Sequence, residues 1–202
     1  MAIKKTTKAK ATKKKASTKK KKVYTIDELQ FSTKPLYDLY IELKGHKEQG
    51  LISSFKLPTI EEQQAKSKYG AKKCEIDGYT FDSIMEGRFY VHLKQEKQKG
   101  NIIDYELQPK YVLQESFKKN GKTIRAIAYI SDFLVTYKDG SQIVYDVKGR
   151  ETADFKLKKK MFDYKYRDLT LKCVQYRARQ KRWMDLDEIQ ALKKKKAKGA
   201  KS

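Results

Sequence analysis

The sequence predicts an α/β domain in which a mixed central β-sheet has helices on both faces. Three observations lead to this expectation. Residues 122–148 have the pattern of a β-hairpin, and amphipathic helices are predicted before and after it, at residues 83–99 and 152–166. Each helix is followed by a short apolar run typical of a strand, at residues 102–107 and 169–174. Strands and helices therefore alternate, which is typical of a layered α/β fold.

The central hairpin is the strongest of these patterns. Two runs rich in β-branched and aromatic residues, 123–137 and 142–148, flank a turn at residues 138–141 that contains Asp139-Gly140. An Asp-Gly pair between such runs favours a tight hairpin turn. The sequence therefore predicts two antiparallel strands joined at this point.

The hairpin is expected to gather charged side chains at one end. Side chains alternate along a strand, so Asp146 and Lys148 share a face while Tyr145 and Val147 take the other. Folding the hairpin brings Asp132 near this pair. Two carboxylates and an ammonium can hold a hard divalent cation and act on a phosphate beside it.

The region before residue 83 is predicted in less detail. Thr33 and Pro35 suit the start of a helix that ends near Gly50. Residues 51–57 suggest a short strand, and residues 59–80 are polar and rich in turn formers. Residues 185–196 predict a short, charged helix at the other end of the chain.

A weak internal repeat occurs at an offset of 50 residues. Its matched positions are Phe31/Phe81, Tyr40/Tyr90, Leu43/Leu93, Lys44/Lys94, Lys47/Lys97, Gly50/Gly100, Ile52/Ile102 and Leu57/Leu107. Chance similarity of two amphipathic helices and duplication of a helix–strand unit both explain it. Leu36 stands where the second copy has Glu86, so the first copy is interpreted as a structural or docking appendage.

These patterns divide the chain into four parts. We expect a disordered lysine-rich tail at residues 1–22, a helix–strand appendage at 23–65 that is a degenerate repeat of 81–107, an α/β core at 66–192, and a second tail at 193–202. The tails lack the apolar residues needed to form a core.

Most of the formal net charge of +23 lies in these tails. Residues 1–22 contain eleven lysines and residues 193–202 contain six, with no acid in either, which leaves 31 basic and 25 acidic side chains between them. Such tails attract polyphosphates without regard to sequence. The alternatives are that they serve solubility or bind another acidic partner.

The sequence predicts a cytoplasmic protein that is neither secreted nor in a membrane. No apolar run approaches the roughly 18 residues of a membrane span, and no signal-peptide apolar segment follows the basic N-terminus. Cys74 and Cys173 match no metal-binding spacing and are interpreted as reduced thiols.

Each candidate site residue also has an ordinary structural explanation. Asp132 could bond to a loop at its strand end, and Lys148 could be a solvated cation. Glu86 shares a helix edge with Tyr90, yet it also completes a capping box that begins at Ser83. Gln108, just before a proline, could touch the site or simply end a strand.

Basic side chains follow the hairpin and are candidates for DNA contact. The candidates are Lys156, Lys158, Lys159, Lys160 and Lys165 on the predicted helix, and Arg177 and Arg179 after the last strand. A solvated helix face explains the lysines equally well. Trp183, nearby, is expected to pack against the domain rather than stack on a base.

The order Glu86 on a helix, Asp132 on a strand, Asp146-x-Lys148 on the next strand and then a helix resembles the PD-(D/E)XK nuclease superfamily. Segments such as Tyr129-Ile-Ser-Asp-Phe133 and Asp146-Val-Lys-Gly149 resemble a phage and prophage family of uncharacterised proteins within it. The resemblance covers roughly residues 66–175. Ser131 replaces the proline of the name-giving pattern, and Asp146 replaces the commoner glutamate.

This resemblance implies a restriction-endonuclease-like core and roles for the site residues. Asp132 and Asp146, assisted by Glu86, would bind Mg²⁺ or Mn²⁺, and Lys148 would orient or activate the attacking water. The relatives include Holliday-junction resolvases, transposon end-cleaving nucleases and restriction enzymes, so the fold does not fix the substrate.

The function expected from the sequence is therefore metal-dependent endonuclease action on DNA, with a branched or recombining intermediate as the favoured substrate. A resolvase-like function would require a homodimer. One alternative is a catalytically inactive nucleic-acid-binding protein that retains the fold, and another is an RNA-binding or packaging protein that acts through its tails.

Overall fold

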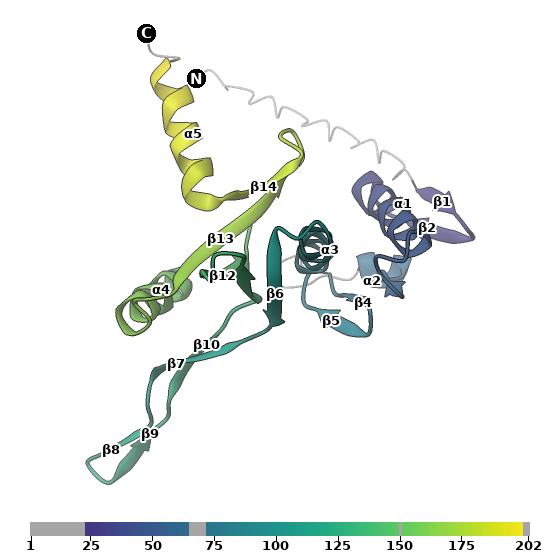
Figure 1. Cartoon of the computed structure of the whole chain (residues 1–202). Coiled ribbons are helices and arrows are strands. Elements are labelled where there is room, and N and C mark those ends of the chain that lie inside the picture. The colour runs from purple at the N-terminus through teal and green to yellow at the C-terminus, as the bar shows by residue number, and fades with distance from the viewer. Residues whose placement is uncertain (1–22, 65–71, 150, 200–202) are drawn as a thin grey trace, which may run out of the picture.

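The computed structural model describes residues 23–64, 72–149 and 151–199. Its centre is a five-stranded sheet of order β14-β13-β12-β11-β6 (Figure 1). The bounds are β6 Ile102–Leu107, β11 Phe133–Tyr137, β12 Gln142–Val147, β13 Thr170–Arg177 and β14 Arg182–Asp185. Only β12 and β13 run parallel within it, so the sheet is mixed. The expected α/β class and mixed central sheet are confirmed.

The two faces of this sheet carry different helices. Phe133, Val135 and Val174 pack with α3 (Ile84–Gln98), whereas Val144 and Leu171 belong to a second cluster with α4 and α5. The bounds of these helices are α4 Ala153–Lys165 and α5 Leu186–Gly199. Side chains alternate along β11 and β12, so neighbouring residues supply opposite faces of the core. The expectation of helices on both faces holds.

The internal repeat is a ββα unit that occurs twice. The first copy consists of β1 Tyr24–Ile26, β2 Leu29–Phe31 and α1 Lys34–Glu48, and the second of β4 Cys74–Ile76, β5 Tyr79–Phe81 and α3. Each bound of the second copy is the first-copy bound plus 50. The matching strand pairs favour duplication over chance, and the repeated unit begins earlier than the sequence analysis placed it.

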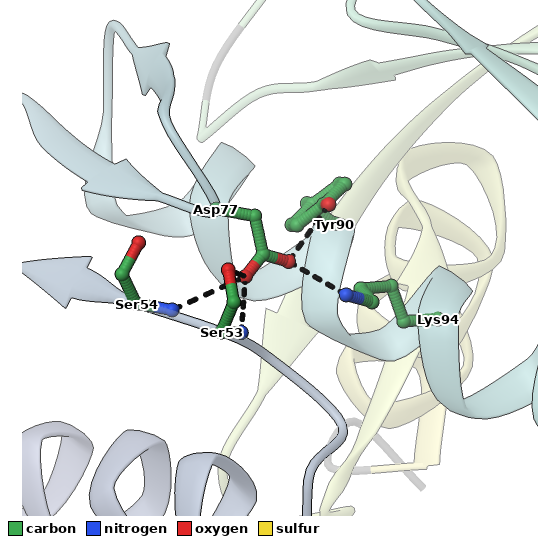
Figure 2. A network of polar contacts seen from close by, with 5 residues as sticks. All are labelled: Ser53, Ser54, Asp77, Tyr90 and Lys94. Atoms are coloured by element: carbon green, nitrogen blue, oxygen red, sulfur yellow. Dashed lines mark hydrogen bonds and ion pairs between the residues drawn. The ribbon is translucent and has the colours of Figure 1, made fainter.

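Both copies close on the same polar network. In the first, Tyr40 and Lys44 contact Asp27 at 2.9 and 2.7 Å. In the second, Tyr90 and Lys94 contact Asp77 at 2.9 and 2.6 Å (Figure 2). Both aspartates adopt positive φ, +48° and +54°, in the turn between the two strands.

Asp77 also joins the two copies to each other. Its Oδ1 accepts hydrogen bonds from the hydroxyl of Ser53, at 2.9 Å, and from the backbone of Ser53 and Ser54 (Figure 2). These serines follow the first copy in the chain. The appendage is thus fastened to the core through the carboxylate at the second-copy turn.

The region between the copies contains a shorter strand than was expected at 51–57 and more regular structure than was expected at 59–80. The strand expected at 51–57 is limited to β3 Phe55–Lys56, and the stretch at 59–80 contains α2 Ile60–Gln64 as well as β4 and most of β5. The short strands β3, β4 and β5 form one small sheet. Strands of two or three residues have too little periodicity to be found in a sequence, and here tertiary packing specifies them.

The strand expected at 123–137 is three strands: β9 Lys122–Ile124, β10 Ile127–Ile130 and β11. On the opposite side of the hairpin β6 is followed by β7 Lys110–Gln114 and β8 Phe117–Lys119. The break between β6 and β7 lies beside the break between β10 and β11. At the first break Gln108 adopts φ +51° before Pro109, and at the second Ser131 donates its N–H to the Pro109 carbonyl at 3.2 Å. Residues 110–130 leave the sheet as a separate two-stranded ribbon, which we call the arm.

The C-terminal end differs from expectation. α5 continues to Gly199, through residues that the sequence analysis assigned to a disordered tail. Leu186 and Ile189 are buried against the sheet and anchor its first turn. Alanine and lysine are good helix formers, so a helix that is anchored there can continue along the lysine run. The other predicted tail residues, 1–22 and 200–202, lie outside the described part of the chain.

None of the helices within the described ranges combines the length and apolar character needed to cross a membrane.

Candidate functional site

The β11–β12 hairpin brings Asp132 and Asp146 to one end of the sheet. Phe133 pairs with Tyr145, and the same register continued by one residue sets Asp132 opposite Asp146. Opposite residues of an antiparallel pair carry their Cβ atoms on one face, about 5 Å apart. The N–H of Val147 donates to Asp132 Oδ2 at 2.6 Å, which fixes this carboxylate beside β12.

Asp146 is buried and both of its carboxylate oxygens have partners. The side chain is 2% exposed; Oδ2 accepts a hydrogen bond from the Tyr129 hydroxyl and Oδ1 forms an ion pair with Lys148. The Lys148 ammonium also lies 4.5 Å from the centroid of the Phe155 ring on α4. Lys148 is therefore held at Asp146 and is not the freely solvated cation of the alternative explanation.

The carboxyl groups at this point interact strongly. Burial raises the pKa of Asp132 to about 8, and the negative charges of Asp146 and Glu86 add to the effect; the bond from Val147 and the charge of Lys148 act in the opposite direction. Like charges this close disfavour full ionisation. A bound cation would remove this cost.

Glu86 has the geometry of the capping box. Its Oε2 accepts from the N–H of Asp82 at 3.1 Å and its Oε1 from the Ser83 hydroxyl at 2.7 Å, while Ser83 Oγ accepts from the N–H of Glu86 at 3.2 Å. Burial raises the pKa of Glu86, against the hydrogen bonds from Ser83 and Asp82, and the negative charge of Asp146 contributes to the rise. Glu86 thus caps its helix and also lies within electrostatic reach of the site.

A cavity of about 200 Å³ opens beside these carboxylates. Among its lining residues are Glu86, Gln108 and Asp132, together with Tyr79, Phe81 and Phe133. Gln108 donates its backbone N–H to the Asp132 carbonyl at 3.0 Å. Both interpretations of Gln108 therefore hold, because it ends β6 and also borders the site.

The donor set of this site fits a hard divalent cation with two protein ligands. Mg²⁺ favours carboxylate oxygens and keeps several waters, so Asp132 and Asp146 are sufficient. Within the described residues no three His, Cys, Asp or Glu side chains are arranged to hold one ion. At this site Glu86 does not join the two aspartates, because its carboxylate is bonded at the start of its own helix. To become a third ligand it would have to rotate away from Ser83.

The buried cysteines take no part in this chemistry. Cys173 lies opposite Asp146 in the β12–β13 ladder. Burial raises the pKa of the Cys74 and Cys173 thiols to about 12, so neither is a thiolate nucleophile near neutral pH.

Most lysines predicted to bind DNA on α4 are paired with carboxylates. The ion pairs are Lys156 with Glu151 at 3.9 Å, Lys158 with Asp154 at 3.2 Å, Lys159 with Asp163 at 3.1 Å and Lys165 with Glu115 at 3.0 Å. Lys160 is exposed and has no such partner among the described residues. The helix face is therefore largely charge-compensated, which weakens its predicted attraction for phosphate.

Arg177 and Arg179 lie at the hairpin between β13 and β14. Arg177 is three residues beyond Val174, which pairs with Val147, so it lies about 10 Å along the strand from the end of β12. Arg179 is exposed in the turn. Trp183 packs edge-on against Phe89 with ring centroids 4.8 Å apart, as the packing interpretation expected.

The sequence analysis gave no role to Tyr129. Its hydroxyl holds Asp146, and burial, followed by the charge of Asp146, raises the pKa of Tyr129 far above its ordinary value. A tyrosine is common in a strand core, so only its placement three residues before Asp132 could have drawn attention to it. The same arrangement disfavours a proline at position 131, since the N–H of Ser131 donates to the Pro109 carbonyl.

A family model described as "Protein of unknown function (DUF1064)" matches residues 66–182, more than half of the chain. The chain belongs to the DUF1064 family. The DUF1064 match contains Glu86, Asp132, Asp146 and Lys148 and excludes the first ββα copy. Comparisons with curated proteins and with solved structures gave no match.

Proposed function

We propose that this DUF1064 protein is a metal-dependent DNA endonuclease with a PD-(D/E)XK-type site. The observation that carries the proposal is the meeting of Asp132 and Asp146 across the β11–β12 hairpin, with Lys148 ion-paired to Asp146. An acidic pair with one member buried, beside an ammonium, is costly to maintain in a fold. A bound cation would use the two carboxylates, and a bound phosphate would use the ammonium of Lys148.

Asp132 and Asp146 would hold Mg²⁺ or Mn²⁺. The bound ion would neutralise charge on the scissile phosphate and lower the pKa of an attacking water. Tyr129 fixes the orientation of Asp146 through its hydroxyl, and Val147 does the same for Asp132 through its N–H.

Lys148 is suited to contact the reacting groups. Its ammonium is anchored to Asp146, and the side chain as a whole is 28% exposed, so part of the side chain faces solvent. From this position it can donate hydrogen bonds to a phosphate oxygen or orient the attacking water. Glu86 would assist by adding a carboxylate to the site once it leaves its cap.

The favoured substrate is branched or recombining DNA, which rests on the resemblance to resolvases. Such a substrate has two scissile strands and would require a homodimer. The competing function, a nucleic-acid-binding protein without catalysis, predicts equal binding and no cleavage. It differs from the proposal only in turnover, so a cleavage assay separates them.

The test incubates the full chain with linear, nicked and four-way-junction DNA in Mg²⁺, Mn²⁺ or chelator. We expect cleavage in either metal and none in chelator. Asp146→Asn and Lys148→Met should each lower the cleavage rate at least about a hundredfold. The matched control is Asp104→Asn, an exposed β6 aspartate paired with Lys97, which should cleave like the wild type. Cleavage in chelator, or full activity of Asp146→Asn, would overturn the proposal.

Glu86→Gln separates the two roles of this residue. Glutamine can complete a capping box, so the substitution should leave the melting temperature nearly unchanged. A loss of cleavage in this variant would assign Glu86 to the metal site. Unchanged cleavage would restrict it to the helix cap.

A further inference from the structure

The arm extends away from the sheet to a free end. β7 pairs with β10 near the sheet, and β8 pairs with β9 at the far end (Figure 1). Tyr111, Leu113 and Tyr129 anchor its base in the cluster with α4. Every residue of β8 and β9 is exposed, so the far end has no supporting contact with the rest of the described chain.

The far end of the arm is strongly basic. Residues 117–125 contain four cations, Lys118, Lys119, Lys122 and Arg125, and no acid. None of the four forms an ion pair within the described ranges, in contrast to most of the lysines on α4. Uncompensated charge on an exposed ribbon is the electrostatic property expected of a polyphosphate contact.

The strand register places two of these cations, Lys119 and Lys122, on one face of the ribbon, whereas Lys118 pairs with Thr123 on the other face. Lys119 pairs directly with Lys122 beside the Asn120-Gly121 turn, where the two residues adopt φ of +50° and +71°. Like charges opposite one another destabilise a strand pair. An anion bound between the two ammonium groups would offset that cost.

An apolar pair lies next to the two lysines. Phe117 pairs with Ile124, two residues from the lysine pair and therefore on the same face. These side chains are 45% and 39% exposed, so both are accessible to a ligand. The face thus presents two apolar side chains between the sheet and two ammonium groups.

We propose that the β8–β9 end of the arm is a binding site for double-stranded DNA, in which the ribbon enters a groove and Lys119 and Lys122 contact the bordering phosphates. The major groove admits a two-stranded β-ribbon. A second copy of this end is a poor occupant, because two copies would bring together eight cations without an acid. Duplex DNA supplies phosphates for the two ammonium groups, and in the major groove it supplies thymine methyl groups for the apolar side chains.

The position of this contact relative to the site follows from strand geometry and rests on the proposed function. Ten residues separate Lys122 from Asp132, which at about 3.3 Å per residue spans at most about 33 Å. One turn of B-DNA is about 34 Å. The arm would therefore contact the duplex within about one helical turn of the phosphate held at Asp132 and Asp146.

The first test measures binding alone, in chelator, so that it does not depend on catalysis. Fluorescence anisotropy with a 30-base-pair duplex compares wild type, Lys119→Gln/Lys122→Gln, and the matched control Lys34→Gln/Lys99→Gln, whose two exposed lysines lie on the ββα copies. Removing two phosphate contacts should lower the slope of log affinity against log salt by about 2 and weaken binding roughly tenfold at physiological salt. The control should bind like the wild type.

Equal affinity of the arm variant and wild type, with far-UV circular dichroism showing both folded, would overturn the proposal. So would equal losses in the arm variant and the control, because the effect would then be one of net charge. A loss for single-stranded DNA that matches the loss for duplex would also overturn it, since the site would then not require a groove.

The second test measures cleavage on duplexes that end at different distances from the cut. Shortening the flank on the arm side below about ten base pairs should lower wild-type cleavage, and the arm variant should be insensitive to flank length. Absence of cleavage on every duplex and on the four-way junction would refute the proposed nuclease activity and leave the binding result intact. If both proteins cleave substrates of every flank length at the normal rate, the proposed DNA contact of the arm is refuted.

Discussion

The acidic pair makes a prediction about stability that needs no substrate. Asp132→Asn should make the metal-free protein more stable at alkaline pH than the wild type. The folded-state pKa of Asp132, about 8, is above the value near 4 expected in the unfolded chain. The native state therefore retains a proton that the unfolded state releases, and the free energy of unfolding of the wild type falls as pH rises from about 4 through 8.

The size of this effect follows from the two pKa values. Between pH 5 and pH 8, about 1.4 kcal/mol per pH unit gives an upper limit of about 4 kcal/mol. The Asp132 carboxyl is partly exposed, so screening by water should reduce this to about 2–4 kcal/mol. Asparagine cannot ionise, and its carbonyl oxygen can still accept the hydrogen bond from Val147.

The assay is urea unfolding of both proteins in chelator at pH 5, 7 and 9. The stability difference in favour of Asp132→Asn should grow across this range by the stated amount, and comparing the two proteins cancels the titration of all other groups. Saturating Mg²⁺ at pH 9 should then stabilise the wild type, by about 3 kcal/mol at one hundred times the Kd, and leave the variant unchanged. A stability difference that stays flat with pH would refute the raised pKa of Asp132, which burial and the neighbouring carboxylates produce.

Two further predictions compare a residue of the second ββα copy with a control residue in the first. Gly87→Ala should destabilise the protein by about 1–3 kcal/mol, because a Cβ there would lie 2.6 Å from the Cys74 sulfur. Gly45→Ala should be neutral or stabilising, because no atom lies within 4 Å of the added Cβ. Thermal melts measure both variants, and equal melting temperatures would contradict the close packing at Gly87. Asp77→Asn should lower the free energy of unfolding by about 2 kcal/mol near neutral pH, because hydrogen bonds outweigh burial and lower the pKa of Asp77 to about 2. Asp27→Asn, at the exposed equivalent position, should leave the urea midpoint unchanged. The Asp77 contribution is present above pH 4 and lost as pH falls toward 2, so the two variants should converge in acid; a constant gap would show that charge is not its source.

Local sequence patterns predicted the elements that carry strong periodicity or turn chemistry. The Asp139-Gly140 turn, the helix capped by Ser83 and the helix capped by Thr152 appear where they were expected. Each of these depends on neighbouring residues, so the sequence alone contains the relevant interactions. The short strands β4 and β5 were missed because their pairing and packing, rather than local preference, specify them.

The candidate site divides in the same way. Hairpin register and side-chain alternation were enough to set Asp132, Asp146 and Lys148 together, because both follow from backbone geometry. The placement of Tyr129 on Asp146 required the arm to bend away at Ser131, which no local pattern indicates. Among the α4 lysines, only the pairing of Lys165 with Glu115 joins residues far apart in the chain, whereas the pairing of Lys159 with Asp163 follows from helical spacing.

By itself, then, the sequence determined the fold class, the central hairpin and the residues that meet at its end, since these follow from periodicity and turn chemistry. Only the tertiary structure decided that the long hairpin splits into a sheet and a projecting arm. It also decided that the four cations of residues 117–125 lie together at the exposed end of that arm, where none forms an ion pair within the described residues. The physical reason is that charge compensation and burial depend on which side chains come together in space, and neighbouring positions in a chain do not specify that.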